Sequence, residues 1–196
     1  MLKFLNRARG FLLHPIETFR LFKGDAFAEA ADYFLILLGT NSILSALLHY
    51  HGVSTLFRDQ MTAFLFGHHL GAVSLFAALA GAVLAGFLLI AITGAMVHLF
   101  VLLVGGRGSI ARTYTAIIYA STPWFLLGWI PVVCCIAGLW TIALAIIGTR
   151  ELQGLSPVRA GIAVLLPVLI VLVLVAATLL PALYGDPYAF ITRYYR

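Results

Sequence analysis

The length, composition and charge of the chain are those of a membrane protein. Of its 196 residues, 63% are apolar and only 10% are charged, whereas a soluble domain is about 45–50% apolar and about 25% charged. A soluble fold of this size cannot bury so much apolar surface. The net charge of +5 comes from basic residues scattered in loops and near the N-terminus, without the basic stripe of a nucleic-acid-binding protein. We therefore expect an all-α, polytopic helical bundle in lipid, with no nucleic-acid partner.

Residues 1–30 are predicted to form a cytoplasmic, amphipathic segment on the membrane surface. A helix over residues 1–13 ends at His14-Pro15, and Pro15 begins a second helix that Gly24 stops. Asp25 is then placed to cap the first span. Apolar side chains of this segment are expected to contact lipid, and basic ones to reach lipid phosphates. The apolar set is Leu2, Phe4, Leu5, Phe11, Leu12, Phe19 and Phe22, and the basic set is Lys3, Arg7, Arg9, Arg20 and Lys23.

Five membrane spans are predicted within a membrane domain over residues 31–183, followed by a short outer tail over 184–196. The spans cover about residues 33–50, 70–104, 111–130, 132–149 and 158–180. Residues 70–104 carry no charge, and as a helix they reach about 50 Å, beyond the roughly 30 Å hydrocarbon core. They form either one tilted helix or a hairpin of two short spans.

Basic residues decide between these two alternatives. With one helix, nine lie on one side of the membrane and three on the other, whereas a hairpin gives seven and five. The positive-inside rule therefore favours five spans, with a cytoplasmic N-terminus in the cell membrane. The nine are Lys3, Arg7, Arg9, Arg20, Lys23, Arg107, Arg112, Arg150 and Arg159; the three are Arg58, Arg193 and Arg196.

Small residues and prolines predict how the spans pack. Residues 78, 82, 86 and 94 are Ala, Ala, Gly and Gly, with Ile90 between them, at four-residue steps that let helices approach closely. Packing within the chain is favoured over a homodimer face. Pro123 and Pro167 are each expected to kink a span, and Ser121 or Thr122 can bond the carbonyls that Pro123 frees.

Few side chains are placed for covalent chemistry, and we expect neither an enzyme nor a cofactor. A metal site formed by His49, His51, His68 and His69 would lack a carboxylate or thiolate at ligand spacing. The serines have no His-Asp partners that suggest a catalytic triad. No carboxylate lies within the five spans, which weakens the case for an ion-coupled carrier. His98 lies in an apolar helix, where it is either functional or, as we favour, a neutral imidazole bonded to a hydroxyl or carbonyl.

The glycine-rich loop over residues 105–109 carries Arg107, and Arg112 follows it. Such a loop could hold a lipid phosphate at the start of the next helix. A plain turn with Ser109 as the helix cap is the favoured alternative. The adjacent Cys134 and Cys135 cannot form an unstrained disulfide with each other.

An ordered set of motifs resembles the Ypt-interacting protein (Yip) domain family in its short prokaryotic form. The motifs are His14-Pro15-Ile16-Glu17-Thr18-Phe19, Gly105-Gly106, Tyr114 with Tyr119-Ala120-Ser121-Thr122-Pro123, Trp140, Arg150-Glu151 and Ser156-Pro157-Val158-Arg159-Ala160. The resemblance covers about residues 10–182 and implies a five-span helical domain. Tyr119 and Pro123 match the family's Tyr…Pro pattern. Eukaryotic relatives bind Rab-type GTPases in vesicle traffic, but this chain lacks their Asp-Leu-x-Gly-Pro motif.

The function expected from the sequence is non-enzymatic: organising the bilayer or partner proteins through the cytoplasmic face. That face comprises residues 1–23, 105–112 and 150–159. The alternative is a small-solute or lipid transporter, with His98 and polar residues of the third span lining a path. Expected partners are membrane lipids, other membrane proteins or a second copy of the chain. The candidate lipid- or partner-binding residues are His14, His98, Arg107, Arg112, Tyr119 and Pro123.

Overall fold

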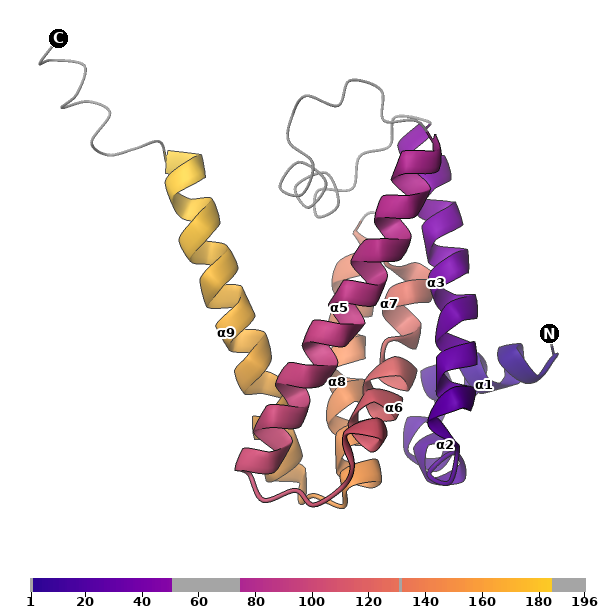
Figure 1. The fold of residues 1–196 in the computed structure, drawn as a ribbon, viewed down its shortest axis with the longest axis vertical. Helices are drawn as coiled ribbons and strands as arrows, with labels where there is room; N and C mark the ends of the chain where they lie inside the picture. The colour runs from indigo at the N-terminus through magenta and orange to yellow at the C-terminus, as the bar shows by residue number, and fades with distance from the viewer. Residues whose placement is uncertain (1, 51–74, 131, 185–196) are drawn as a thin grey trace, which may run out of the picture.

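A computed structural model describes residues 2–50, 75–130 and 132–184. These residues form helices and turns without a β-strand. In chain order the helices are α1 (Leu2–Leu13), α2 (Pro15–Leu21), α3 (Phe27–Tyr50), α5 (Leu75–Leu103), α6 (Ile110–Ala120), α7 (Thr122–Leu127), α8 (Val133–Gln153) and α9 (Pro157–Tyr184). Figure 1 shows α3, α5, α6, α7 and α8 gathered in one bundle, while α9 leans away from it toward the C-terminus. The all-α prediction is confirmed for the described part of the chain.

The long apolar stretch is one helix. α5 runs without interruption from Leu75 to Leu103, so the hairpin alternative is wrong for these residues, while residues 70–74 lie outside the described ranges. Within the described ranges, three helices are long and apolar enough to cross a membrane, namely α5, α8 and α9. They correspond to the second, fourth and fifth predicted spans.

The third predicted span, over residues 111–130, consists of two helices rather than one. α6 ends at Ala120, and α7 begins at Thr122 with Pro123 in its first turn. The Ser121 hydroxyl donates a hydrogen bond to the Ile118 carbonyl at 2.7 Å. The Thr122 hydroxyl donates to the Tyr119 carbonyl, also at 2.7 Å. The predicted effect of Pro123 is therefore confirmed, and it is strong enough to divide the span. By contrast, α9 runs unbroken through Pro167.

Two glycines of α5 mark where its neighbours approach. A Cβ added at Gly86 would meet the Leu38 side chain of α3, and one at Gly94 would lie 2.7 Å from Cδ1 of Tyr114 in α6. A larger side chain at either position would push these helices apart. The predicted packing of the small residues within the chain is confirmed at Gly86 and Gly94.

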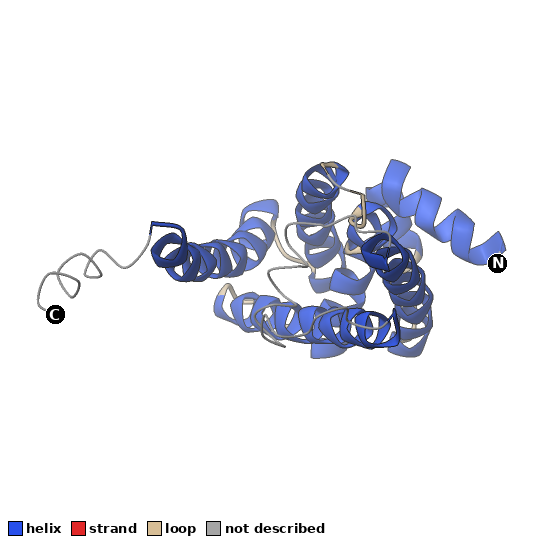
Figure 2. Ribbon diagram, turned by 90° about the horizontal axis from the view of Figure 1, so that it is seen from above, coloured by secondary structure: helices blue, strands red, loops and turns tan. Residues whose placement is uncertain are grey.

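The N-terminal helices are docked onto the bundle. Phe11 and Phe19 are fully buried, and the Phe11 ring stacks on Tyr119 with the centroids 4.7 Å apart. The expectation that Phe11 and Phe19 contact lipid was therefore wrong, because this aromatic face packs against protein. Leu5 and Leu21 remain exposed on the other face, and Figure 2 shows α1 along the outside of the bundle.

One end of the molecule gathers three segments that are distant in sequence. The Arg20 guanidinium of α2 forms an ion pair with Glu151 near the end of α8, at 3.1 Å. The Gln153 side-chain amide donates to the carbonyl of Ser109 in the α5–α6 loop, at 3.1 Å. Figure 1 shows α2 and the α5–α6 and α8–α9 loops at this end. The segments assigned to one side of the membrane from the sequence are thus neighbours.

Candidate functional site

Arg7 of α1 is the centre of a polar cluster whose members are mostly buried, except for the exposed Glu29. Its Nη2 lies 3.3 Å from Oδ2 of Asp25 and 3.7 Å from Oε2 of Glu29. Its Nη1 donates to the Tyr119 hydroxyl at 3.3 Å, and that hydroxyl donates to Oδ2 of Asp25 at 2.5 Å. The side chains of Arg7 and Asp25 are only 19% and 14% exposed. We call these four residues the Arg7 cluster.

Aromatic rings surround the guanidinium of Arg7. Its Cζ lies 4.3 Å from the centroid of the Phe22 ring, and the Tyr33 and Tyr119 rings lie within 5.9 Å and 5.5 Å. A planar, weakly hydrated guanidinium suits such a site, where it gains cation–π attraction. A lysine ammonium has neither the planar shape nor the fork of donors. The cluster is therefore built for arginine.

Tyr33, one of the rings around the Arg7 guanidinium, is hydrogen-bonded to the break between α6 and α7. The hydroxyls of Tyr33 and Thr122 lie 3.0 Å apart and share a hydrogen bond. Thr122 is also the residue that bonds the Tyr119 carbonyl. Residues of α1, α3, α6 and α7 thus form one connected network around Tyr119. Of the residues predicted from the sequence, Tyr119 belongs to this network and Pro123 lies directly beside it.

His98 belongs to a separate buried chain of polar groups. Its Nδ1 lies 2.8 Å from Oγ1 of Thr113 in α6, and the Gln153 amide of α8 donates to the same oxygen at 2.7 Å. Thr113 is fully buried and Gln153 nearly so. The interpretation of His98 as an imidazole bonded to a hydroxyl is confirmed. The chain joins α5, α6 and α8.

The other three predicted residues belong neither to the network around the Arg7 cluster nor to the chain of His98, Thr113 and Gln153. His14, Arg107 and Arg112 are exposed, and among the described residues no carboxylate pairs with either arginine. Ser109 is the N-cap residue of α6, as predicted, although its side chain makes no cap hydrogen bond. Gly105 has φ +87°, a backbone conformation that favours glycine, and the loop is a turn with an exposed basic residue.

Metal ligation finds no support among the described residues, where His, Cys, Asp and Glu form no group of three that could hold a metal. The residues named in the histidine hypothesis are not described there: the His49 side chain and His51, His68 and His69 all fall outside. Cys134 and Cys135 are free thiols.

The sequence interpretation missed the Arg7 cluster. It assigned Arg7 to lipid phosphates and Asp25 to a helix cap, whereas the two form an ion pair. The available signal was the spacing of Asp25 and Glu29, because two carboxylates four residues apart at the start of a helix repel each other and favour a nearby cation. Nothing local could identify that cation, because Arg7 lies on another helix and meets Asp25 only in the folded chain.

The fold and the apolar helices together define a helical membrane protein with a docked N-terminal pair of helices. The model of the Yip1 domain matches residues 9–179. The chain therefore belongs to the Yip1 domain family, which confirms the resemblance noted in its motifs. The match begins within α1 and ends within α9, so it includes the Arg7 cluster partners Asp25, Glu29 and Tyr119. No curated protein and no solved structure matches the chain.

Proposed function

We propose that the protein is a non-enzymatic, five-span protein of the cell membrane that organises the bilayer or partner proteins through its cytoplasmic face. In this proposal α3 and the α6–α7 pair are the first and third spans, and the N-terminus is cytoplasmic. Lipids, other membrane proteins or a second copy are its partners. The polar groups of the interior then serve to hold the helices in place.

One observation carries this proposal: exposed cations gather at the end of the molecule that includes α2. Lys23, Arg107, Arg112 and Arg159 are exposed, and none has an ion-pair partner among the described residues. We call these four residues the cationic face. The described residues 75–104 and 113–149, which make up most of the bundle, carry no charged side chain except histidine. Each basic residue near an anionic surface is worth about 1 kcal/mol, so the face attracts acidic lipids or acidic partner surfaces.

The N-terminal helices add an apolar border to the cationic face. Arg7 and Arg20 form ion pairs with carboxylates of the protein, and the buried rings of Phe11 and Phe19 pack α1 and α2 against the bundle. Leu13, Ile16 and Leu21 are consequently held outward. A rigid surface with cations and exposed leucines loses less conformational entropy on binding than a free tail.

The proposal is tested by crosslinking in native membranes followed by purification of the full chain. We expect defined partners with the wild type and their loss with the double variant Arg107→Gln, Arg112→Gln. The matched control is Arg107→Lys with Arg112→Lys, which keeps the charge and should keep the partners. Recovery of the same partners with all three proteins would contradict a role for the cationic face.

A transporter is the second candidate, favoured by the buried chain of His98, Thr113 and Gln153. Polar side chains between spans are expensive in lipid and often mark pathways. Solute flux into vesicles that contain the purified protein distinguishes the two functions. Facilitated flux that Thr113→Val abolishes would replace the organising role by transport.

A further inference from the structure

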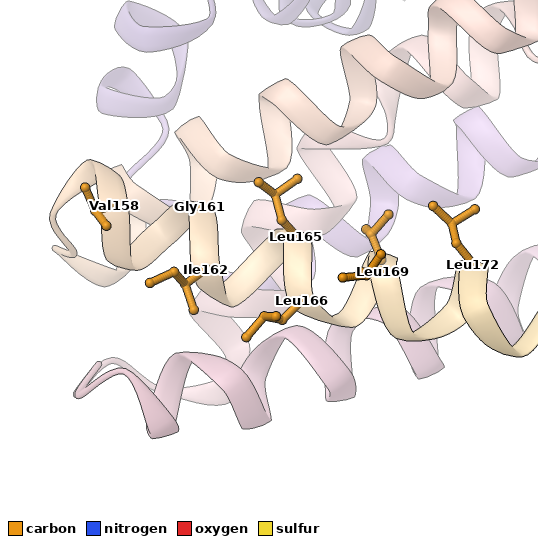
Figure 3. A pocket seen from close by; sticks show the side chains of 8 residues that line it. Val158, Gly161, Ile162, Leu165, Leu166, Leu169 and Leu172 are labelled. Atoms are coloured by element: carbon orange, nitrogen blue, oxygen red, sulfur yellow. The ribbon is translucent and has the colours of Figure 1, made fainter.

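α9 carries an apolar groove on its outer side. The helix leans away from the bundle (Figures 1 and 2), and the groove of about 510 Å³ follows it from Val158 to Leu172. Figure 3 shows Ile162, Leu165 and Leu169 among the side chains that succeed one another along it. The groove lining consists of aliphatic side chains and one glycine, Gly161.

The groove is separate from the face by which α9 is held in the protein. Ala160, Ala163 and Val164 are buried and provide the packing surface of α9. At Gly161, an added Cβ would meet no atom within 4 Å. The groove is therefore open space on a different side of α9 from these buried residues.

The length of the groove corresponds to one lipid chain. From Val158 to Leu172 the helix rises by about 21 Å. One leaflet contributes about half of the roughly 30 Å hydrocarbon core. An acyl chain that begins at the start of α9 fits within this length.

A cation, Arg159, directly follows Val158, the residue at which the groove begins. Arg159 is exposed, and its Nη1 lies 3.8 Å from the position of a Cβ on Gly105, beside the α5–α6 loop. Among the described residues no carboxylate neutralises it. Arg159 also lies in the first turn of α9, where the helix dipole favours an anion. Positive charge at one end of an apolar groove is complementary to an anionic amphiphile.

We propose that the groove binds one acyl chain of an anionic glycerophospholipid, with the phosphate held by Arg159 at the start of α9. A second copy of the chain fits less well. In a two-fold dimer formed through this groove, equivalent residues lie at the same depth, so both Arg159 side chains would lie at the same end of the interface and add like charges there. A lipid brings the opposite charge to the same place. This site rests on the proposed function, because Arg159 belongs to the cationic face and α9 is taken as a membrane span.

The test uses the full chain in lipid nanodiscs that contain phosphatidylglycerol with a photoreactive acyl chain, in a phosphatidylcholine background. We expect crosslinks to concentrate in the Val158–Leu172 peptide. Gly161→Phe fills the groove and should remove most of them. The matched control, Gly39→Phe on α3, also adds a ring where a Cβ meets no atom within 4 Å, and it should leave them unchanged.

The phosphate contact has its own readout. Arg159→Gln should lower the preference for phosphatidylglycerol over phosphatidylcholine about fivefold, whereas Arg112→Gln, also at the cationic face, should not change it at this peptide. This arm holds even if Gly161→Phe fails to fold. Crosslinks spread over α3, α5 and α9 in proportion to exposure, and indifferent to both variants, would overturn the proposal. So would chain-to-chain crosslinks through Leu165→Cys in place of the lipid.

Discussion

Arg7 shows how one residue can attach a terminal helix to a membrane bundle. Its guanidinium neutralises Asp25 at 3.3 Å and bonds the Tyr119 hydroxyl at 3.3 Å. We predict that Arg7→Gln lowers the free energy of unfolding by about 1–3 kcal/mol, because it leaves the mostly buried Asp25 carboxylate without its cationic partner. Thermal unfolding in detergent, compared with the wild type, measures this effect.

Arg9→Gln is the matched control for Arg7, because Arg9 lies on the same helix and is exposed. It should change stability little. Asp25→Asn introduced together with Arg7→Gln should cost less than the sum of the single changes, since the unpaired charge is then gone. Equal stabilities of Arg7→Gln and Arg9→Gln would mean that the Arg7 cluster does not hold α1.

Thr122 makes two bonds that a valine of similar shape cannot make. Its hydroxyl bonds the Tyr119 carbonyl and shares a hydrogen bond with the Tyr33 hydroxyl. Thr122→Val is expected to destabilise the protein by about 1–3 kcal/mol, because both partners are buried and left unsatisfied. Thr40→Val should cost clearly less, since exposed Thr40 bonds only the Ile36 carbonyl within its own helix. The midpoints of thermal unfolding of the two variants measure this difference. Equal midpoints would contradict the prediction.

At the scale of elements, α2 depends on a glycine of α8. A Cβ on Gly148 would lie 2.7 Å from the ring of Phe19 and 3.4 Å from Cβ of Ala116. Gly148→Ala is therefore predicted to cost about 1–3 kcal/mol through overpacking and to loosen α2. Proteolysis between α2 and α3 would report the loosening. Gly39→Ala, where the new Cβ meets no atom within 4 Å, should change neither stability nor cleavage.

Local signals were sufficient to predict most helix boundaries. Pro15 begins α2 as expected, and Pro123 divides the third span because a proline removes a backbone donor whatever surrounds it. Local signals do not predict whether lipid or protein covers an apolar face. Phe11 and Phe19 belong to a face that lipid and protein could cover equally well, since both are apolar. The pairing of Arg7 with Asp25 places this face against protein rather than lipid, and that pairing depends on the tertiary fold.

The whole molecule separates its charges along the bundle, and this separation predicts its orientation. Arg107 lies in the loop beside Gln153, at one end of α8, whereas exposed Val132 precedes the other end. The 21 residues of α8 place these ends about 30 Å apart, the thickness of the hydrocarbon core. Nine basic residues belong to segments at the end with Arg107 or to the N-terminal helices, which the positive-inside rule assigns to the cytoplasm.

Single cysteines in a background without Cys134 and Cys135 test this orientation in intact cells. We predict that Arg107→Cys and Leu21→Cys, both at exposed positions at the same end, are protected from a membrane-impermeant thiol reagent until the cells are opened. Val132→Cys should react at once, because the proposed orientation places the turn before α8 outside the cell. A permeant reagent that labels all three variants provides the control for accessibility. Labelling of Arg107→Cys and Val132→Cys from the same side would mean that α8 does not cross the membrane. Protection of Val132→Cys with reaction of the other two would mean that the protein is inserted the opposite way, with the cationic face outside.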